Sequence, residues 1–490
     1  MLKENIELTE AQKRTKAWAL SNEKLFGGGV IAAQVGVGKT LMALSLTAHD
    51  ALLRPTERDL YIVPPTLQDQ WIKEAEKLTH LKTLLYSKYT DDFTFAHLYA
   101  APQLHMIVLS YQTLLRAPET SILFKIKWKR IIADEAHCLG NAKSQTTQKV
   151  CLLQAQYRWA VSGTPLTNTP KDLFGVSLFL RYVETIGQFN KAISNGKLIQ
   201  ELVTQSTKED LDNLDLKELV SKAVYVDMTV KEKELYDHLR RSIKRSIIIR
   251  KSDGAKRMQV SVFELLNRLR TAASNIHLTN DPRGWEAEGV AGGPAVHLGT
   301  MRGKGSKTSM VINLIGAIRQ RFPNAKILLF SNFLDIISDY ECHLREAFPS
   351  DGPPLVYTGK IPRQHRTAMV EHFKNSSASD CRVLILGFKC GNAGINLQCA
   401  THVILNEPFW NQSLEQQAIA RAYRKGQTEK VYAYRMLTRT TIDERIRKVA
   451  ERKQERINAV LSGKAVTAAA ATQTLDKIST QEMDYLLGPS

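Results

Sequence analysis

The sequence predicts an α/β protein with two doubly wound parallel sheets and a helical insert between them. Short apolar strands alternate with helical patterns up to about residue 180, and the alternation returns at about residue 307. Between these regions strand patterns are sparse and charged amphipathic helical patterns prevail. We therefore expect an N-terminal lobe (1–180), a helical insert (181–278), a glycine-rich linker (279–306), a second lobe (307–446) and a C-terminal helix and tail (447–490).

Apolar runs bounded by turn residues mark the expected strands. In the first lobe these are Val30–Ala33, Leu60–Val63, Met106–Leu109, Ile131–Ala133 and Trp159–Val161. In the second they are Ile327–Phe330, Leu355–Tyr357, Val383–Leu386 and His402–Leu405. Helical patterns cover 231–239, 262–273 and 441–463, and a short helix is expected before Leu487.

Charge is the most informative feature of the composition. The 490 residues include 67 Lys and Arg against 49 Asp and Glu, a net charge of +18. This excess favours a polyanionic partner, nucleic acid above all, although a basic face that is merely solvated is the alternative. No apolar run is long enough to span a membrane, and the six cysteines lack Cys-x-x-Cys spacing. We therefore expect no membrane association, no zinc site and no disulfide framework.

A phosphate-binding loop is predicted near the N-terminus. An apolar run, 30–32, leads into a glycine-containing segment, and a helical pattern begins at Leu41. Glycines allow backbone N–H groups to close around phosphate oxygens, and the helix N-terminus adds positive potential. The lysine of such a loop meets the β- and γ-phosphates, and the threonine hydroxyl reaches Mg²⁺. The expected nucleotide-binding residues are Gly36, Val37, Gly38, Lys39 and Thr40. The alternative is a glycine-rich turn before a packed helix.

Two adjacent acids end a second apolar run. Asp134 and Glu135 follow the strand expected over 131–133. We expect Asp134 to hold Mg²⁺ and Glu135 to orient or deprotonate the water that attacks the γ-phosphate. The alternative is a strand end capped by solvated acids. Nearby His137 is expected to be a hydrogen-bonding residue and not a metal ligand, because no second histidine has metal-ligand spacing.

Two arginines in the second lobe complete the predicted catalytic set. Residues 413–424 are expected to form one helix that carries Gln417, Arg421 and Arg424 at i, i+4 and i+7, hence on one face. Forked guanidinium groups suit bidentate phosphate contact. Arg421 and Arg424 are therefore expected to reach the γ-phosphate. A basic, solvated helix face is the alternative.

Taken together, these patterns resemble the Swi/Snf family of helicase superfamily 2, the DNA-translocating ATPases. The resemblance runs from Leu8 to about Ile446. Its other segments are 8–12, 62–71, 108–114, 162–168, 328–333, 389–397 and the Ala-Tyr-Arg-Lys-Gly-Gln stretch at 422–427. The chain departs from the family pattern at Ala33 and Gln34, which replace an acidic pair.

The resemblance implies two RecA-like lobes and a DNA-dependent ATPase that uses ATP and Mg²⁺. It implies that Gln12 reads the adenine and that double-stranded DNA is the partner, with nucleosomes as a possible load. Thr66, Thr113, Asn396 and Trp410 are the expected contacts to the DNA backbone. A nuclear location is implied, with the cytoplasm of a virus-infected or bacterial cell as the alternative. An RNA helicase of the same superfamily and a non-catalytic ATP-binding scaffold remain alternative functions.

Overall fold

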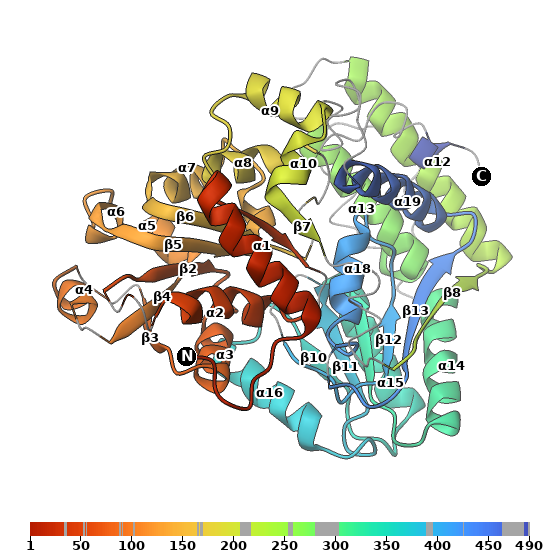
Figure 1. Cartoon of the computed structure of the whole chain (residues 1–490). Coiled ribbons are helices and arrows are strands. Elements are labelled where there is room, and N and C mark those ends of the chain that lie inside the picture. The colour runs from red at the N-terminus through yellow and green to blue at the C-terminus, as the bar shows by residue number, and fades with distance from the viewer. Residues whose placement is uncertain are drawn as a thin grey trace. The chain divides into compact units, whose positions relative to one another are not determined.

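The computed structural model describes residues 1–33, 37–51, 54, 56–87, 90, 92–100, 103–163, 166, 170–205, 217–252, 258–279, 303–388, 395–424, 426–462 and 485–488 (Figure 1). The chain forms two compact units. Unit 1 comprises Met1–Leu216 and Lys453–Lys477, and unit 2 comprises Lys217–Arg452 and Ile478–Ser490.

Unit 1 is built on a seven-stranded parallel sheet in the order β3-β4-β2-β5-β6-β1-β7. Its strands are β1 (Gly28–Ala32), β2 (Asp59–Val63), β3 (Lys82–Tyr86), β4 (Leu104–Ser110), β5 (Lys127–Asp134), β6 (Gln154–Val161) and β7 (Val203–Gln205). Its helices are α1 (Glu10–Phe26), α2 (Lys39–Asp50), α3 (Gln68–Leu78), α4 (Asp92–Tyr99), α5 (Tyr111–Arg116), α6 (Ile122–Lys125), α7 (Gln145–Leu152), α8 (Asp172–Phe179), α9 (Ile186–Ser194) and α10 (Lys197–Leu202), with a 3₁₀ turn, η1, at Ala136–Leu139.

Both faces of this sheet are buried, as a parallel sheet requires. Along β2, Leu60 and Ile62 enter one apolar core, whereas Tyr61 and Val63 enter the other. Side chains of α5, α7 and α8 fill the first core, and those of α1, α2 and α3 fill the second. The strands therefore read as continuous apolar runs in the sequence.

Unit 2 repeats this plan with a six-stranded parallel sheet in the order β10-β11-β9-β12-β13-β8. Its strands are β8 (Leu219–Val226), β9 (Ile327–Ser331), β10 (Leu355–Tyr357), β11 (Val383–Gly387), β12 (His402–Leu405) and β13 (Val431–Thr438). Its helices are α12 (Val230–Ser252), α13 (Met258–Ser274), α14 (Ser306–Arg321), α15 (Leu334–Ala347), α16 (Arg363–Asn375) and α18 (Gln412–Ile419), with a 3₁₀ turn, η2, at Ile276–Thr279. Helix α19 (Ile442–Leu461) follows β13.

The predicted fold class, with two doubly wound parallel sheets, is confirmed. Every expected strand is present. The structure has four further strands, β3, β7, β8 and β13, that were not predicted. Strands β7 and β8 lie inside the segment expected to be a helical insert, where β8 pairs along its whole length with β13. Edge strand β8 carries exposed Ser221 and Lys222, which interrupt its apolar pattern. An edge strand pairs with only one neighbour and can carry exposed polar side chains. It therefore lacks the continuous apolar run by which the other strands were predicted.

In the described part of the chain, no helix has both the length and the apolar character needed to cross a bilayer.

A buried histidine makes the stability of unit 2 depend on pH. His402 is 1 % exposed, its ring stacks on Tyr432 at 4.9 Å, and burial lowers its pKa to about 4. The unfolded chain binds a proton near pH 6.5, whereas the folded chain does not until about pH 4, so stability falls as pH falls through this window. His402→Phe should reduce the loss of unfolding free energy between pH 7 and pH 4.5 by on the order of 2 kcal/mol. Urea unfolding at pH 7, 5.5 and 4.5 measures it, with exposed His365→Phe as the control; equal slopes would contradict the prediction.

Candidate nucleotide-binding site

The phosphate loop lies between a buried strand and the half-buried start of a helix. Strand β1 ends at Ala32 and α2 begins at Lys39, with Gly38 as its N-cap at φ 89°. The Lys39 Nζ donates to the Ala33 carbonyl at 3.0 Å. Gly38 offers no side-chain cap to the first N–H groups of α2. Those N–H groups and the lysine form an anion-binding helix start. Gly36, also predicted to bind nucleotide, lies outside the described residues.

Gln12 is attached directly to this loop. It is 3 % exposed, and its Nε2 donates to the Val37 carbonyl at 3.0 Å. Its other amide atom, Oε1, accepts from the Thr9 backbone N–H at 3.0 Å, while the Thr9 hydroxyl accepts from the Gln12 N–H at 3.3 Å. This reciprocal capping box begins α1 and fixes the glutamine rotamer. The structure therefore brings Gln12, Val37, Gly38, Lys39 and Thr40 together.

Gly38→Ala should raise the KM for ATP about tenfold. A Cβ at Gly38 would lie 2.5 Å from the Gln12 Nε2, and the backbone has the left-handed conformation. That conformation costs roughly 1–2 kcal/mol in any residue with a Cβ, and 1.4 kcal/mol is tenfold in affinity. Gly27→Ala is a matched control, because Gly27 has φ 75° with no atom within 4 Å of a new Cβ. Steady-state kinetics measure both variants, and an unchanged KM in Gly38→Ala would count against the loop geometry.

Asp134 and Glu135 stand at the end of β5, next to β2 and β6 in the sheet. Burial and the neighbouring Glu135 carboxylate raise the pKa of Asp134 to about 6, while Trp71 and Lys39 act in the opposite direction. Glu135 turns away from the strand with φ 49°, and its N–H donates to the Asp134 Oδ1 at 2.9 Å. The electrostatic influence of Lys39 on Asp134 links this strand end to the phosphate loop.

Two aromatic residues hold Asp134, and sequence reasoning gave neither this role. The Trp71 Nε1 donates to the Asp134 Oδ2 at 2.8 Å, and the Tyr111 hydroxyl donates to the Asp134 carbonyl at 2.8 Å. Both belong to segments, 62–71 and 108–114, that the family resemblance had singled out. The available signal was topological, since Trp71 follows β2, Tyr111 follows β4, and all strands of a parallel sheet end at the same edge as β5.

His137 forms an ion pair with the predicted catalytic base. Its Nδ1 lies 3.2 Å from the Glu135 Oε2. Burial alone would lower the pKa of His137, but proximity to Cys138 and Glu135 raises it to about 10. The imidazolium thus faces Glu135 at neutral pH. The described residues contain no group of three or more metal-binding side chains of the His, Cys, Asp or Glu type.

The helix expected over 413–424 is shorter than predicted. Helix α18 ends at Ile419, and the next residues tighten into a turn in which the N–H of Arg421 donates to Ala418 at 3.2 Å. Gln417 lies in the helix, but Arg421 and Arg424 follow it, so the shared helix face predicted for these three residues is wrong.

Tertiary contacts explain why α18 ends early. The Leu397 N–H donates a hydrogen bond to the Arg421 carbonyl at 3.0 Å. That carbonyl is then not available as an acceptor for a continuing helix. The Gln427 Nε2 donates to the carbonyls of Gln398, Ala400 and Ala422 at 2.9–3.2 Å. Arg421 is 6 % exposed and is therefore fixed in place, with its turn tied to the segment that contains Asn396.

A buried polar cluster positions the carboxyl ends of β9 and β12 in unit 2. Glu407 is fully buried, and it accepts from the Ser331 hydroxyl at 2.7 Å and from the Asn332 N–H at 3.1 Å. Lys307, also buried, donates to the Asn406 carbonyl at 3.0 Å and to Asp443 at 2.5 Å. These contacts fix the segment 328–333, which the family resemblance had singled out.

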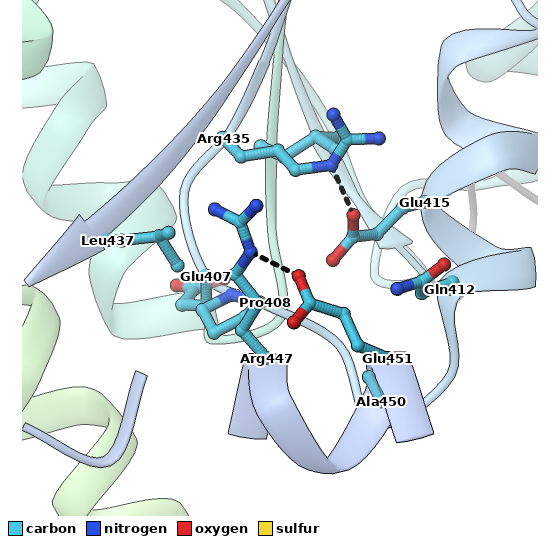
Figure 2. A pocket seen from close by; sticks show the side chains of 10 residues that line it. Glu407, Pro408, Gln412, Glu415, Arg435, Leu437, Arg447, Ala450 and Glu451 are labelled. Carbon is cyan, nitrogen blue, oxygen red and sulfur yellow. Dashed lines mark hydrogen bonds and ion pairs between the residues drawn. The ribbon is translucent and has the colours of Figure 1, made fainter. Parts of the chain in front are cut away.

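A pocket of about 200 Å³ in unit 2 lies beside α18 (Figure 2). Two of its three carboxylates are paired with arginines: the Arg435 Nε lies 2.7 Å from Glu415, and the Arg447 Nε lies 2.8 Å from Glu451. The first pair attaches α18 to β13. The remaining lining residues are Leu405, Glu407, Pro408, Gln412, Leu437 and Ala450. This ion pair between Arg435 and Glu415 therefore helps to hold the helix that leads to Arg421.

The four expected DNA contacts have different environments. Thr66 is exposed in the turn before α3, and Asn396 is exposed with its Nδ2 bonded to Gln398 at 2.9 Å. The Thr113 hydroxyl lies 2.8 Å from the Ser110 hydroxyl at the start of α5. Trp410 is half-buried, with the Arg270 guanidinium 5.8 Å from its ring. Their role in binding DNA stays a prediction.

Comparison with protein families matches both units. A SNF2-related domain matches residues 11–278, more than half of the chain, and a helicase conserved C-terminal domain matches residues 306–426. The chain belongs to the SNF2-related family. The predicted resemblance is confirmed, and this SNF2-related protein is an ATP-dependent enzyme of the helicase-like class.

Relatives of the SNF2-related chain include a viral protein and proteins of cellular organisms. A probable global transactivator of Orgyia pseudotsugata multicapsid polyhedrosis virus is 29 % identical over 449 residues, covering 88 % of this chain and 86 % of the relative. A putative SWI/SNF-related matrix-associated actin-dependent regulator of chromatin from Arabidopsis thaliana is 25 % identical, covering 88 % of this chain and 66 % of the relative. The ISWI chromatin-remodelling complex ATPase ISW2 of Saccharomyces cerevisiae is 26 % identical, covering 90 % and 39 %. The chain thus spans two thirds or less of these cellular relatives.

One solved structure that aligns with the SNF2-related chain is the Sulfolobus solfataricus SWI2/SNF2 ATPase core in complex with double-stranded DNA. It is 20 % identical, with a TM-score of 0.40, and the alignment covers 99 % of this chain and 98 % of that one.

Proposed function

We propose that this protein is a double-stranded DNA translocase of the Swi/Snf type, which hydrolyses ATP to move along DNA and to remodel chromatin or other protein–DNA complexes. The observation that carries the proposal is the cluster in unit 1, where Lys39 at the start of α2 acts electrostatically on the buried Asp134 carboxylate. A cation, a helix N-terminus and a paired carboxylate are the parts that phosphoryl transfer needs.

The residues of unit 1 fit MgATP. Gly38 is left-handed and lacks a Cβ, so no side chain of its own screens the backbone from phosphate oxygens, and the Gln12 amide lies where a Cβ would project. Thr40 and Asp134 would hold Mg²⁺, which neutralises phosphate charge when bound. Lys39 binds the phosphates, Gln12 contacts the adenine, and Glu135, oriented by His137, takes the proton of the attacking water. We propose that Arg421 and Arg424 contact the γ-phosphate.

Nucleic acid binding follows from charge. A net charge of +18 supports contact mainly through phosphates, so DNA affinity should fall steeply with salt and depend little on sequence. Thr66, Thr113, Asn396 and Trp410 are the proposed backbone contacts. We propose a nuclear location, with the nucleosome as the protein–DNA complex that is remodelled. The alternative location is the cytoplasm of a virus-infected or bacterial cell, which the viral and bacterial relatives support.

ATP turnover with different nucleic acids tests the proposal. We expect stimulation by double-stranded DNA, little stimulation by single-stranded RNA, and no separation of a labelled duplex. Stimulation by RNA together with strand separation would favour the RNA helicase alternative. Nucleotide binding without turnover on any nucleic acid would favour the scaffold. A nucleosome-sliding assay then tests the load.

A further inference from the structure

The last described residues occupy an apolar groove in unit 2. Leu486 and Leu487 are 1 % and 4 % exposed. They belong to a core that α12, α13 and α19 line with Tyr236, Leu266 and Ile446 among others. Figure 1 shows the short blue turn that contains the last described residues beside α12. We call the surface between these three helices the C-terminal groove.

Two arginines on the edge of the C-terminal groove hold the backbone of this segment. The Arg445 Nη1 donates to the carbonyls of Tyr485, Leu486 and Gly488 at 3.1, 3.0 and 2.7 Å. Arg240 of α12 also donates to the Gly488 carbonyl. Cations at the carbonyl end of a helical turn satisfy acceptors that the turn leaves open. The groove therefore recognises two features, a pair of leucines and the open carbonyls that end a short turn.

The Tyr485 ring adds a third contact. The Arg452 guanidinium lies 5.6 Å from its centroid, a cation–π distance. Arg240, Arg445 and Arg452 thus come from two helices, α12 and α19, and converge on four residues. No acidic side chain of the segment 485–488 takes part, because it contains none. Recognition depends on apolar side chains and backbone carbonyls.

We propose that the C-terminal groove is a peptide-binding site and that Tyr485–Gly488 is its tethered, exchangeable ligand. Two leucines and a few hydrogen bonds make a small contact, and small contacts are weak when the partners are separate. Covalent attachment supplies an effective concentration of about millimolar, which keeps such a weak ligand bound. When the segment leaves, it uncovers an apolar surface on three helices. Tyr485–Gly488 therefore covers a docking surface. In the resting protein this segment of the chain itself occupies the C-terminal groove.

A binding experiment on the full chain tests this inference. Leu486→Asp combined with Leu487→Asp empties the C-terminal groove, and a fluorescein-labelled peptide of residues 478–490 is then added. We expect saturable binding to the variant and at least tenfold weaker apparent binding to the wild type, whose groove is filled. Arg445→Gln in the variant should weaken peptide binding at least tenfold. A peptide that carries both aspartates should not bind.

Controls separate loss of the ligand from loss of the fold. Leu334→Asp places the same charge at an exposed leucine of unit 2 and should leave the wild-type behaviour unchanged. If the double aspartate variant unfolds, Leu486→Ala with Leu487→Ala removes the anchors without adding charge. Equal peptide binding to the wild type and to a folded variant, or none to either, would overturn the proposal. Concentration-dependent dimers of the wild type that the tail substitutions abolish would also overturn it, because a second copy would then be the occupant.

Discussion

Lys39→Ala should lower ATP turnover by about 10²–10³-fold, the loss that follows removal of one preorganised charge from a transition state. The Lys39 Nζ stands at the start of α2 beside the Ala33 carbonyl, and its charge favours the ionised form of Asp134. Alanine removes both the phosphate-binding cation and this support. Because Lys39 is only half-buried, the fold should survive. Phosphate release at saturating ATP and double-stranded DNA measures the effect.

Two further variants locate the cause of this loss. Lys24→Ala, at an exposed position in the last turn of α1, removes a lysine from unit 1 outside the phosphate loop and should retain wild-type turnover. Lys39→Arg keeps the charge but changes its shape, so it should recover nucleotide binding more than turnover. Turnover of Lys39→Ala within twofold of the wild type would refute the assignment of the phosphate loop.

The strands around the nucleotide site could be predicted because their burial is two-sided. Residues such as Ile131 and Ile132 enter opposite cores, so no polar residue interrupts the run before Asp134. The phosphate loop was equally visible, because its glycines and lysine are adjacent in sequence. Local patterns therefore sufficed wherever the chemistry of the site is itself local.

Contacts between distant segments could not be predicted in this way. Trp71 meets Asp134 across 63 positions of the sequence, and nothing in the α3 pattern distinguishes this indole from an ordinary core residue. Helix α18 shows the same limit. Its helical periodicity continues beyond Ile419, but Leu397 and Gln427 bond to the carbonyls of the residues that follow α18, which a longer helix would need. The geometry of Arg421 therefore depends on residues that only the fold brings near.

Arg130→Ala should destabilise unit 1 by about 3–5 kcal/mol, the range for breaking a buried ion pair from one side. The Arg130 side chain is 1 % exposed and lies 2.6 Å from Glu23, 2.7 Å from Asp50 and 3.5 Å from Asp59. Alanine would leave these carboxylates without their cation in a place that water cannot easily reach. Urea unfolding followed by tryptophan fluorescence measures the loss; one of the six tryptophans, Trp159, donates to Glu23 at 2.9 Å.

The pH dependence identifies the mechanism of that loss. Burial would raise the pKa of Asp50, but the contact with Arg130 lowers it below its ordinary value, so the pair stabilises the wild type at neutral pH and loses this contribution as pH falls below about 4. Without Arg130, Asp50 and Asp59 lose the cation that lowers their pKa values, so the pKa of each should rise. Protonation then relieves the variant, so the difference in unfolding free energy should shrink between pH 7 and pH 5. Arg54→Ala, which breaks the exposed pair with Glu57, should cost no more than about 1 kcal/mol at either pH. A pH-independent loss in Arg130→Ala would instead indicate lost packing, since alanine also removes the buried arginine stem.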